Sequence, residues 1–277
     1  MNCPLELRNH YRAGKVIPFV GAGVSMSVQW NTGGSQRRGP SWTELVDEAI
    51  RQLGFSRVDL ARVRATDLQI LEYFRLVNNG LTRLTNWLVL NMDAPPTALL
   101  ASPIHEELCA LAKSRLIYTT NFDDFLERCF ELRKRKCKAV AIEDHMADCD
   151  ADVTEIVKFH GDLNHPQQML LSESQYERRL SLSTAMDYRL KSDLLGRTVL
   201  FIGYSFRDPN VSYLFRLINE QFRALPGSST GRRAYITVPD PSDFEIRLFR
   251  ERNIEVIGVD GMTLTEDITK LLQEMRS

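Results

Sequence analysis

Six short apolar segments, most of them separated by stretches with helical spacing of apolar residues, constrain the fold of this chain most strongly. They cover residues 15–20, 116–120, 156–159, 199–203, 234–238 and 254–259. Nearly continuous apolar runs of this length are typical of strands that are buried on both faces, and strands that alternate with helices form parallel sheets. We therefore expect an α/β fold with a Rossmann-like, doubly wound parallel sheet of about six strands.

The length of 277 residues allows one large core together with a helical insertion. We expect a single domain over 1–277. Its expected parts are a Rossmann-like core in about 1–25, 113–163 and 196–277, and helical insertions in about 41–112 and 166–195.

Two features follow the first apolar segment. The glycine- and arginine-rich stretch 29–40 is interpreted either as a surface loop or as a mobile lid whose arginines meet a pyrophosphate. Ser41 and Glu44 have the spacing of a capping box and predict the beginning of a helix.

The composition indicates a soluble globular protein. Hydrophobic residues make up 43% and charged residues 26% of the chain, and the formal net charge is −1, so no global field draws it to nucleic acid or to a membrane. No apolar run reaches about 18 residues and the start lacks a signal peptide, so we expect a cytoplasmic location. The five cysteines are an odd number without a C-x-x-C pair, which argues against a zinc site or a disulfide framework.

The first apolar segment ends in a glycine turn, Gly21-Ala22-Gly23, followed by Ser25. A glycine permits a tight turn, and a second glycine lets a phosphate reach backbone N–H groups at the start of a helix. The third glycine of the dinucleotide fingerprint is missing. A phosphate cradle and an ordinary strand-to-helix turn therefore both remain open.

Unusual residues follow four of the predicted strands directly. They are Gly21 and Gly23 after the first, Asn121 and Asp123 after the second, His160 after the third, and Gly203 and Ser205 after the fourth. Ligands of doubly wound sheets bind beyond the carboxyl ends of the strands, so these residues are expected to share one edge. A structural histidine and a helix-capping asparagine are the alternatives for single members of the set.

Four segments in this order, Gly21–Ser25, Thr120–Asp123, Phe159–Gly161 and Gly203–Ser205, resemble the ordered motifs of the sirtuin family, which consumes NAD. Deacylating sirtuins carry a zinc ribbon, whereas no cysteine lies between His160 and Ser205. The chain is more similar to the zinc-less sirtuin-like domains of bacterial anti-phage defence, which hydrolyse NAD, including the sirtuin subunit that is partnered with a HerA-type ATPase.

This resemblance implies a set of roles. Asn121 and His160 are expected to be catalytic, with Asn121 orienting the carboxamide or a water and His160 accepting a proton. Ribose and phosphate contacts are expected from Gly21, Ala22, Gly23, Ser25, Asp123, Gly203 and Ser205. NAD is then the substrate, no metal is needed, and the products are nicotinamide and ADP-ribose.

The resemblance also implies partners and leaves rival functions open. We expect a homo-oligomer and a separate partner protein, such as a HerA-type ATPase or an Argonaute-like protein, that triggers the enzyme. One alternative is an NAD-dependent protein deacylase or ADP-ribosyltransferase, and another is a non-catalytic subunit that binds NAD or ADP-ribose. Direct nucleic-acid binding through the basic stretch 128–138 is disfavoured by the neutral net charge.

Overall fold

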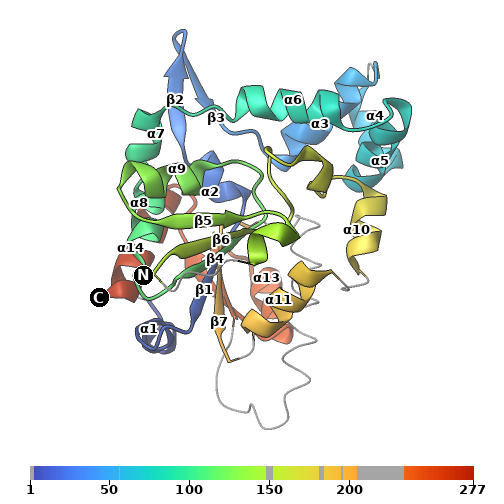
Figure 1. Cartoon of the computed structure of the whole chain (residues 1–277). Coiled ribbons are helices and arrows are strands. Elements are labelled where there is room, and N and C mark those ends of the chain that lie inside the picture. The colour runs from blue at the N-terminus through green and yellow to red at the C-terminus, as the bar shows by residue number, and fades with distance from the viewer. Residues whose placement is uncertain (1–2, 56, 148–151, 181–183, 195, 205–233) are drawn as a thin grey trace.

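A computed structural model gives the fold, and it describes residues 3–55, 57–147, 152–180, 184–194, 196–204 and 234–277. Within these residues a central sheet has seven parallel strands in the order β5-β6-β4-β1-β7-β8-β9 (Figure 1). The strands are β1 (Val16–Val20), β4 (Leu116–Thr119), β5 (Cys137–Val140), β6 (Thr154–Lys158), β7 (Thr198–Ile202), β8 (Ala234–Pro239) and β9 (Ile254–Val259). The predicted α/β class with a parallel sheet is confirmed.

Helices cover both faces of this sheet, as a doubly wound fold requires. One face packs against α1 (Leu5–Arg12), α8 (Pro103–Ala110), α9 (Phe125–Leu132) and α14 (Leu264–Arg276). The other face packs against α11 (Ala185–Leu194) and α13 (Asp243–Glu251). Alternate residues of one strand divide between the two cores: Val16 and Val20 of β1 enter the first, and Ile17 and Phe19 the second.

A helical subdomain follows the first βα unit and has a hydrophobic core of its own. It contains α3 (Trp42–Gln52), α4 (Val58–Arg64), α5 (Asp67–Val77) and α6 (Thr82–Asn91), beyond which lies α7 (Pro96–Leu100). The predicted capping box begins α3: Glu44 N donates to Ser41 Oγ at 3.2 Å, and Ser41 N donates to Glu44 Oε2 at 2.7 Å. Phe122, Met169 and Leu171 join this core to the sheet edge.

Two strand assignments differ from the sequence prediction. The stretch 29–40 is not a loop: β2 (Gln29–Thr32) and β3 (Ser35–Arg38) form an antiparallel hairpin that projects from the body (Figure 1). The sheet also contains β5, which was not predicted. The hairpin strands are mostly exposed, and β5 is only partly buried up to its last residue, so no buried apolar face marked these segments in the sequence.

The second predicted helical stretch, 166–195, is helical only in part. It contains a short 3-10 turn (Pro166–Gln168), α10 (Glu173–Leu180) and α11. No helix in the described ranges combines the length and the apolar character that a membrane crossing needs.

Candidate active site

The carboxyl ends of four neighbouring strands, β6, β4, β1 and β7, bring the predicted residues to one edge of the sheet. Strand β1 lies between β4 and β7, and the chain passes from one side of β1 to the other there. Such a point, where the strand order reverses, is where doubly wound sheets bind ligands. The site is therefore built from the turn after β1 and from the segments after its neighbours.

The turn after β1 packs directly against the turn after β7. Gly21 N donates to Ile202 O at 2.8 Å and Gly23 N donates to Gly203 O at 2.9 Å. A Cβ atom on Gly23 would lie 2.9 Å from Gly203 Cα, which is closer than real contacts allow. Glycine is needed here for close backbone approach. The N–H groups of Gly21 and Gly23, which were expected to hold a pyrophosphate, are bonded to carbonyl groups of the chain itself in this conformation.

A buried hydrogen-bond chain joins the turn after β1 to the segment after β4. Asn121 Nδ2 donates to Gly21 O at 3.0 Å and to Ser25 Oγ at 2.8 Å, and Ser25 Oγ donates to Asp123 Oδ2 at 2.7 Å. Asp123 Oδ1 also accepts from Phe125 N at 3.1 Å, at the beginning of α9. These hydrogen bonds join residues that are 96 to 100 positions apart in the chain. The sequence predicted that these residues would share one edge of the sheet.

A small cavity of about 50 Å³ opens beside this hydrogen-bond chain. Its lining includes Ala22, Ser25, Asn121 and Asp123 together with Trp42 of α3. Small-molecule sites in proteins usually measure roughly 300–1,000 Å³. The described residues leave room here for only a few water molecules, so a dinucleotide would enter only if this edge opened.

His160 follows β6 but is closed off from solvent. The residue is 0% exposed, and its ring centroid lies 5.7 Å from those of Phe159 and Tyr176. Neither ring nitrogen has a hydrogen-bond partner among the described residues. Burial, and to a lesser degree the nearby Arg179 guanidinium, lowers the pKa of His160 to about 3, so the imidazole is neutral at physiological pH.

Among the described elements, helix α10 packs against His160. Tyr176 comes from this helix, and so does Arg179, whose guanidinium lies 4.2 Å from the Phe159 ring and donates to Phe159 O at 3.1 Å. Arg179 Nε also forms an ion pair at 2.8 Å with Asp187 of α11, which is 0% exposed. At the N-terminal end of α10, Ser174 Oγ donates to Glu72 of α5 at 2.9 Å. No hydrogen bond within the described part of the chain joins the His160 ring to Asn121 or Ser25.

The other predicted site residues have separate outcomes. Gly203 lies at the carboxyl end of β7 against Gly21 and Gly23, whereas Ser205 lies outside the described residues. In the ranges that the structure describes, no group of three or more His, Cys, Asp or Glu side chains could hold a metal ion.

Sequence reasoning missed a buried charged cluster next to Asp123. It consists of Lys158 at the end of β6, Glu127 of α9, and Asp162, and Lys158 is 1% exposed. Burial lowers the pKa of Lys158, but the charges of Glu127 and Asp123 outweigh that effect and the pKa is raised. A lysine within an apolar strand, two positions before His160, was the signal that could have revealed the cluster.

The fold and this edge define a Rossmann-like α/β protein with a polar site at the carboxyl ends of its central strands. Residues 115–257, just over half of the chain, match the SIR2-like domain family. The chain belongs to that family.

Curated relatives support the same assignment. The chain is 27% identical over 271 residues to "NAD(+) hydrolase ThsA" of Acinetobacter baumannii (strain 532279), covering 93% of this chain and 52% of that protein. It is 26% identical over 263 residues to "Defense-associated sirtuin 2" of Bacillus subtilis, covering 91% of this chain and 24% of that protein. The chain therefore spans about half the length of the first of these relatives and a quarter of the second.

The chain also resembles a solved structure described as "Structural Basis for the Mechanism and Regulation of Sir2 Enzymes". The match covers 98% of this chain and 97% of the chain in that structure. Its TM-score is 0.48 and its sequence identity 11%, so this similarity is too weak to carry an argument about function.

Proposed function

We propose that the chain is an NAD glycohydrolase that cleaves the bond between nicotinamide and ribose. The observation that carries the proposal is the buried hydrogen-bond chain from Asn121 through Ser25 to Asp123, which lines a cavity at the point where the strand order reverses. Membership of the SIR2-like family and the similarity to proteins named NAD(+) hydrolase over 93% of the chain give the substrate its identity.

The proposed reaction separates neutral nicotinamide from the ribose and adds water at the anomeric carbon, which yields ADP-ribose and one proton. The ribose becomes cationic as the bond breaks. Asp123 supplies a nearby negative charge, and the Asn121 amide, which Gly21 and Ser25 hold in one orientation, binds the carboxamide or the attacking water. Gly21, Ala22, Gly23, Gly203 and Ser205 are proposed to line the phosphate and ribose end of the site.

His160 is proposed to take up the proton that the reaction releases. An imidazole with a pKa of about 3 is a poor base at neutral pH, because general bases work best when their pKa lies near the operating pH. Withdrawal of α10 would rehydrate the ring, and its pKa would return toward the ordinary value near 6.5. The described conformation is thus proposed to be a resting one.

Control by other proteins is part of the proposal. An enzyme that consumes NAD must be inactive until it is needed, and the names of the relatives include a defence-associated sirtuin. We propose a role in anti-phage defence, with self-association and with a separate partner, such as a HerA-type ATPase or an Argonaute-like protein, as the trigger.

The test is nicotinamide release from NAD, followed by chromatography for the chain alone and for the chain with the product of the neighbouring gene. We expect Asn121→Ala to lower the rate about 100-fold, a typical cost of losing one preorganised hydrogen-bonding group. The matched control is Asn31→Ala, in the exposed β2–β3 hairpin, which should keep the full rate. Full rates for both Asn121→Ala and His160→Ala would contradict the assignment.

A second candidate function is a non-catalytic module that binds NAD or ADP-ribose. The closed position of His160 favours it, because that ring has no path to a ligand in the described conformation. This candidate predicts that ADP-ribose raises the melting temperature. It also predicts that no nicotinamide is released from NAD, either by the chain alone or by the chain with the product of the neighbouring gene.

A further inference from the structure

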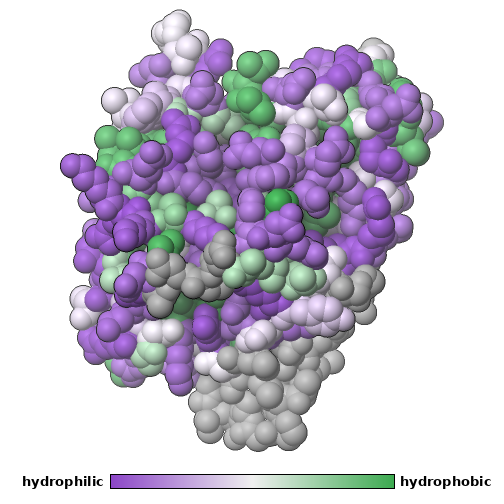
Figure 2. Space-filling view, in the orientation of Figure 1, coloured by the Kyte–Doolittle hydropathy of each residue, from purple (hydrophilic) through white to green (hydrophobic). Residues whose placement is uncertain are grey.

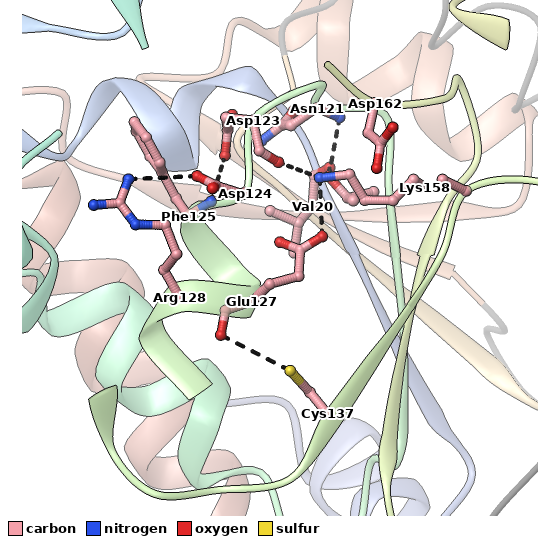
Figure 3. Close-up of polar contacts among 12 residues, drawn as sticks. Val20, Asn121, Asp123, Asp124, Phe125, Glu127, Arg128, Cys137, Lys158 and Asp162 are labelled. Carbon is pink, nitrogen blue, oxygen red and sulfur yellow. Dashed lines mark hydrogen bonds and ion pairs between the residues drawn. The ribbon is translucent and has the colours of Figure 1, made fainter. Parts of the chain in front are cut away.

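Lys158 connects two segments that the proposed reaction uses. It is the last residue of β6, two positions before His160, and its side chain is 1% exposed. Its ammonium group donates to the backbone carbonyl of Asp123 and forms an ion pair with Glu127 Oε1 at 3.2 Å (Figure 3). One buried cation therefore reaches from the strand that carries His160 to the segment that carries Asn121.

The segment from Thr120 to Asp124 needs such support. It lies between β4 and α9, outside any helix or strand, yet Asn121 and Asp123 within it are buried. A second contact on the same side is the hydrogen bond from Leu163 N to Phe122 O at 3.1 Å. Phe122 and Asp123 line both the 50 Å³ cavity beside Asn121 and a polar cleft of about 690 Å³ to which Lys158 and Glu127 contribute. The Asp123 carbonyl, to which Lys158 donates, thus belongs to the segment that lies between the cavity and the cleft.

Charge balance shows that Glu127 is not the only group that accommodates the ammonium. Asp123 and Asp162 also act on Lys158 electrostatically, and both are buried. Burial raises the pKa of Glu127, and the charge of Lys158 opposes that rise. Neutralising Glu127 would leave the ammonium facing two carboxylates and still bonded to the Asp123 carbonyl, so the carbonyl contact and the ion pair can be separated by mutation.

We propose that Lys158 is a positioning residue: through the Asp123 carbonyl it sets where the Asn121 amide and the Asp123 carboxylate lie relative to the reacting sugar. This inference rests on the proposed NAD hydrolase function. The structural alternative is that Lys158 and Glu127 form an ion pair that only stabilises the fold. Misplacing a positioned group by about 1 Å can lower a rate about 100-fold without weakening substrate binding.

The test uses Glu127→Gln and the double variant Lys158→Met/Glu127→Gln, which removes both charges and nearly conserves volume. We expect Glu127→Gln to keep kcat within about twofold of the wild type, and the double variant to lower kcat at least about 30-fold with KM for NAD nearly unchanged. The matched control is Arg189→Met/Glu155→Gln, which removes another partly buried ion pair of β6, at the opposite end of the strand. It should keep the wild-type kcat.

A measurement that needs no turnover accompanies the kinetics. Hydrogen exchange followed by mass spectrometry should show faster exchange in the peptide around Thr120–Phe125 for the Lys158 double variant, and unchanged exchange for Glu127→Gln and for the control. Faster exchange in the double variant, found together with a wild type that releases no nicotinamide, would support the positioning role and reject the hydrolase. Wild-type turnover together with unchanged kcat and unchanged exchange in the double variant would reject the positioning role alone.

If the double variant does not fold, Glu127→Gln still provides a test that can overturn the proposal. Its Lys158 still donates to the Asp123 carbonyl, so full kcat and unchanged exchange are expected. A 30-fold loss of kcat in Glu127→Gln would show that the ion pair, and not the carbonyl contact, is what matters, and would overturn the proposal.

Discussion

His160 is the residue whose surroundings differ most from those of a histidine in water. Its ring is fully buried and no described residue forms a hydrogen bond with either nitrogen. Buried polar groups in native proteins nearly always have partners, and unpaired ones mark strain, catalysis or a missing ligand. Among the alternatives that the sequence left open, a structural histidine with satisfied hydrogen bonds is the one that this geometry disfavours.

Burial of His160 makes folding sensitive to acid. Its pKa is about 3 in the folded chain and ordinarily near 6.5, so the unfolded chain binds a proton that the folded chain does not. The stability that the neutral, buried imidazole gives to the folded state is fully present above about pH 6.5, and it is lost as the pH falls toward 3. Between pH 7.5 and 5 we expect His160→Leu to lose about 2 kcal/mol less stability than the wild type in urea unfolding. If the free energies of unfolding of the wild type and of His160→Leu changed in parallel with pH, the burial of His160 would be contradicted.

Gly23 is predicted to tolerate no side chain. A Cβ atom there would lie 2.9 Å from Gly203 Cα and 3.0 Å from Gly203 O, both backbone atoms that cannot rotate away. We expect Gly23→Ala to reduce the free energy of unfolding by about 1–3 kcal/mol. Gly39→Ala, whose Cβ would meet nothing nearer than 4.0 Å, is the matched control and should cost much less. Equal unfolding midpoints in urea would contradict the close packing of the two turns.

The sequence identified residues that follow strands and lie at one edge of the sheet, because the strand ends of a parallel sheet meet at one edge. It did not identify Lys158 or Glu127. Lysine is almost never fully buried unless it is paired, and its partner on α9 is 31 positions earlier in the chain, so only the packing of α9 against β6 shows the pair.

At the scale of elements, the strongly apolar strands were predictable and the polar ones were not. β1 and β7 are buried at every position, whereas only the last residue of β5 is buried. The β2–β3 hairpin has no buried residue, so no hydrophobic alternation marks it. Its Arg38, expected to be free in a loop or to meet a pyrophosphate, instead forms a two-pronged ion pair with Glu44 at 2.9 and 3.2 Å.

Helix α10 is predicted to control access to His160. Arg179 fixes this helix to Phe159 and Asp187, so the double variant Arg179→Met/Asp187→Asn should loosen it without leaving a buried charge unpaired. We expect His160 to react with diethyl pyrocarbonate at least about tenfold faster, measured by peptide mass spectrometry, as local opening becomes easier. Arg178→Met, at an exposed position of the same helix, is the control. Equal reactivity of His160 in all three proteins would contradict a covering role for α10.

At the scale of the whole molecule, hydrophobic residues reach the surface on the helical subdomain. Tyr73, Leu76 and Val77 of α5 and Leu90 of α6 are exposed. The face seen in Figure 2 is mostly hydrophilic, with hydrophobic areas over the part where Figure 1 places α4 to α6 and others elsewhere, including near α7. On the other side of α5, Ile70, Leu71 and Phe74 are buried in the subdomain core. The helix is therefore apolar around most of its surface, which is typical of a helix that also contacts another protein surface.

Self-association through α5 is therefore expected. Size-exclusion chromatography with light scattering at micromolar concentration should give an oligomer for the wild type and a smaller species for Leu76→Glu/Val77→Glu, because charges resist burial in an interface. Leu5→Glu, at an exposed position of α1, should leave the mass unchanged. A monomeric wild type would contradict the expectation.

The most direct measurement for the hydrolase proposal is the fate of NAD in water enriched in ¹⁸O, with the chain and its neighbouring gene product present. Water is the proposed acceptor of the ribose, so nicotinamide and ADP-ribose should appear in equal amounts from the first minutes. Each newly formed ADP-ribose, quenched before exchange with solvent, should carry one ¹⁸O at the anomeric carbon. Nicotinamide release that requires an acylated or protein acceptor, or no release at all, would contradict the account.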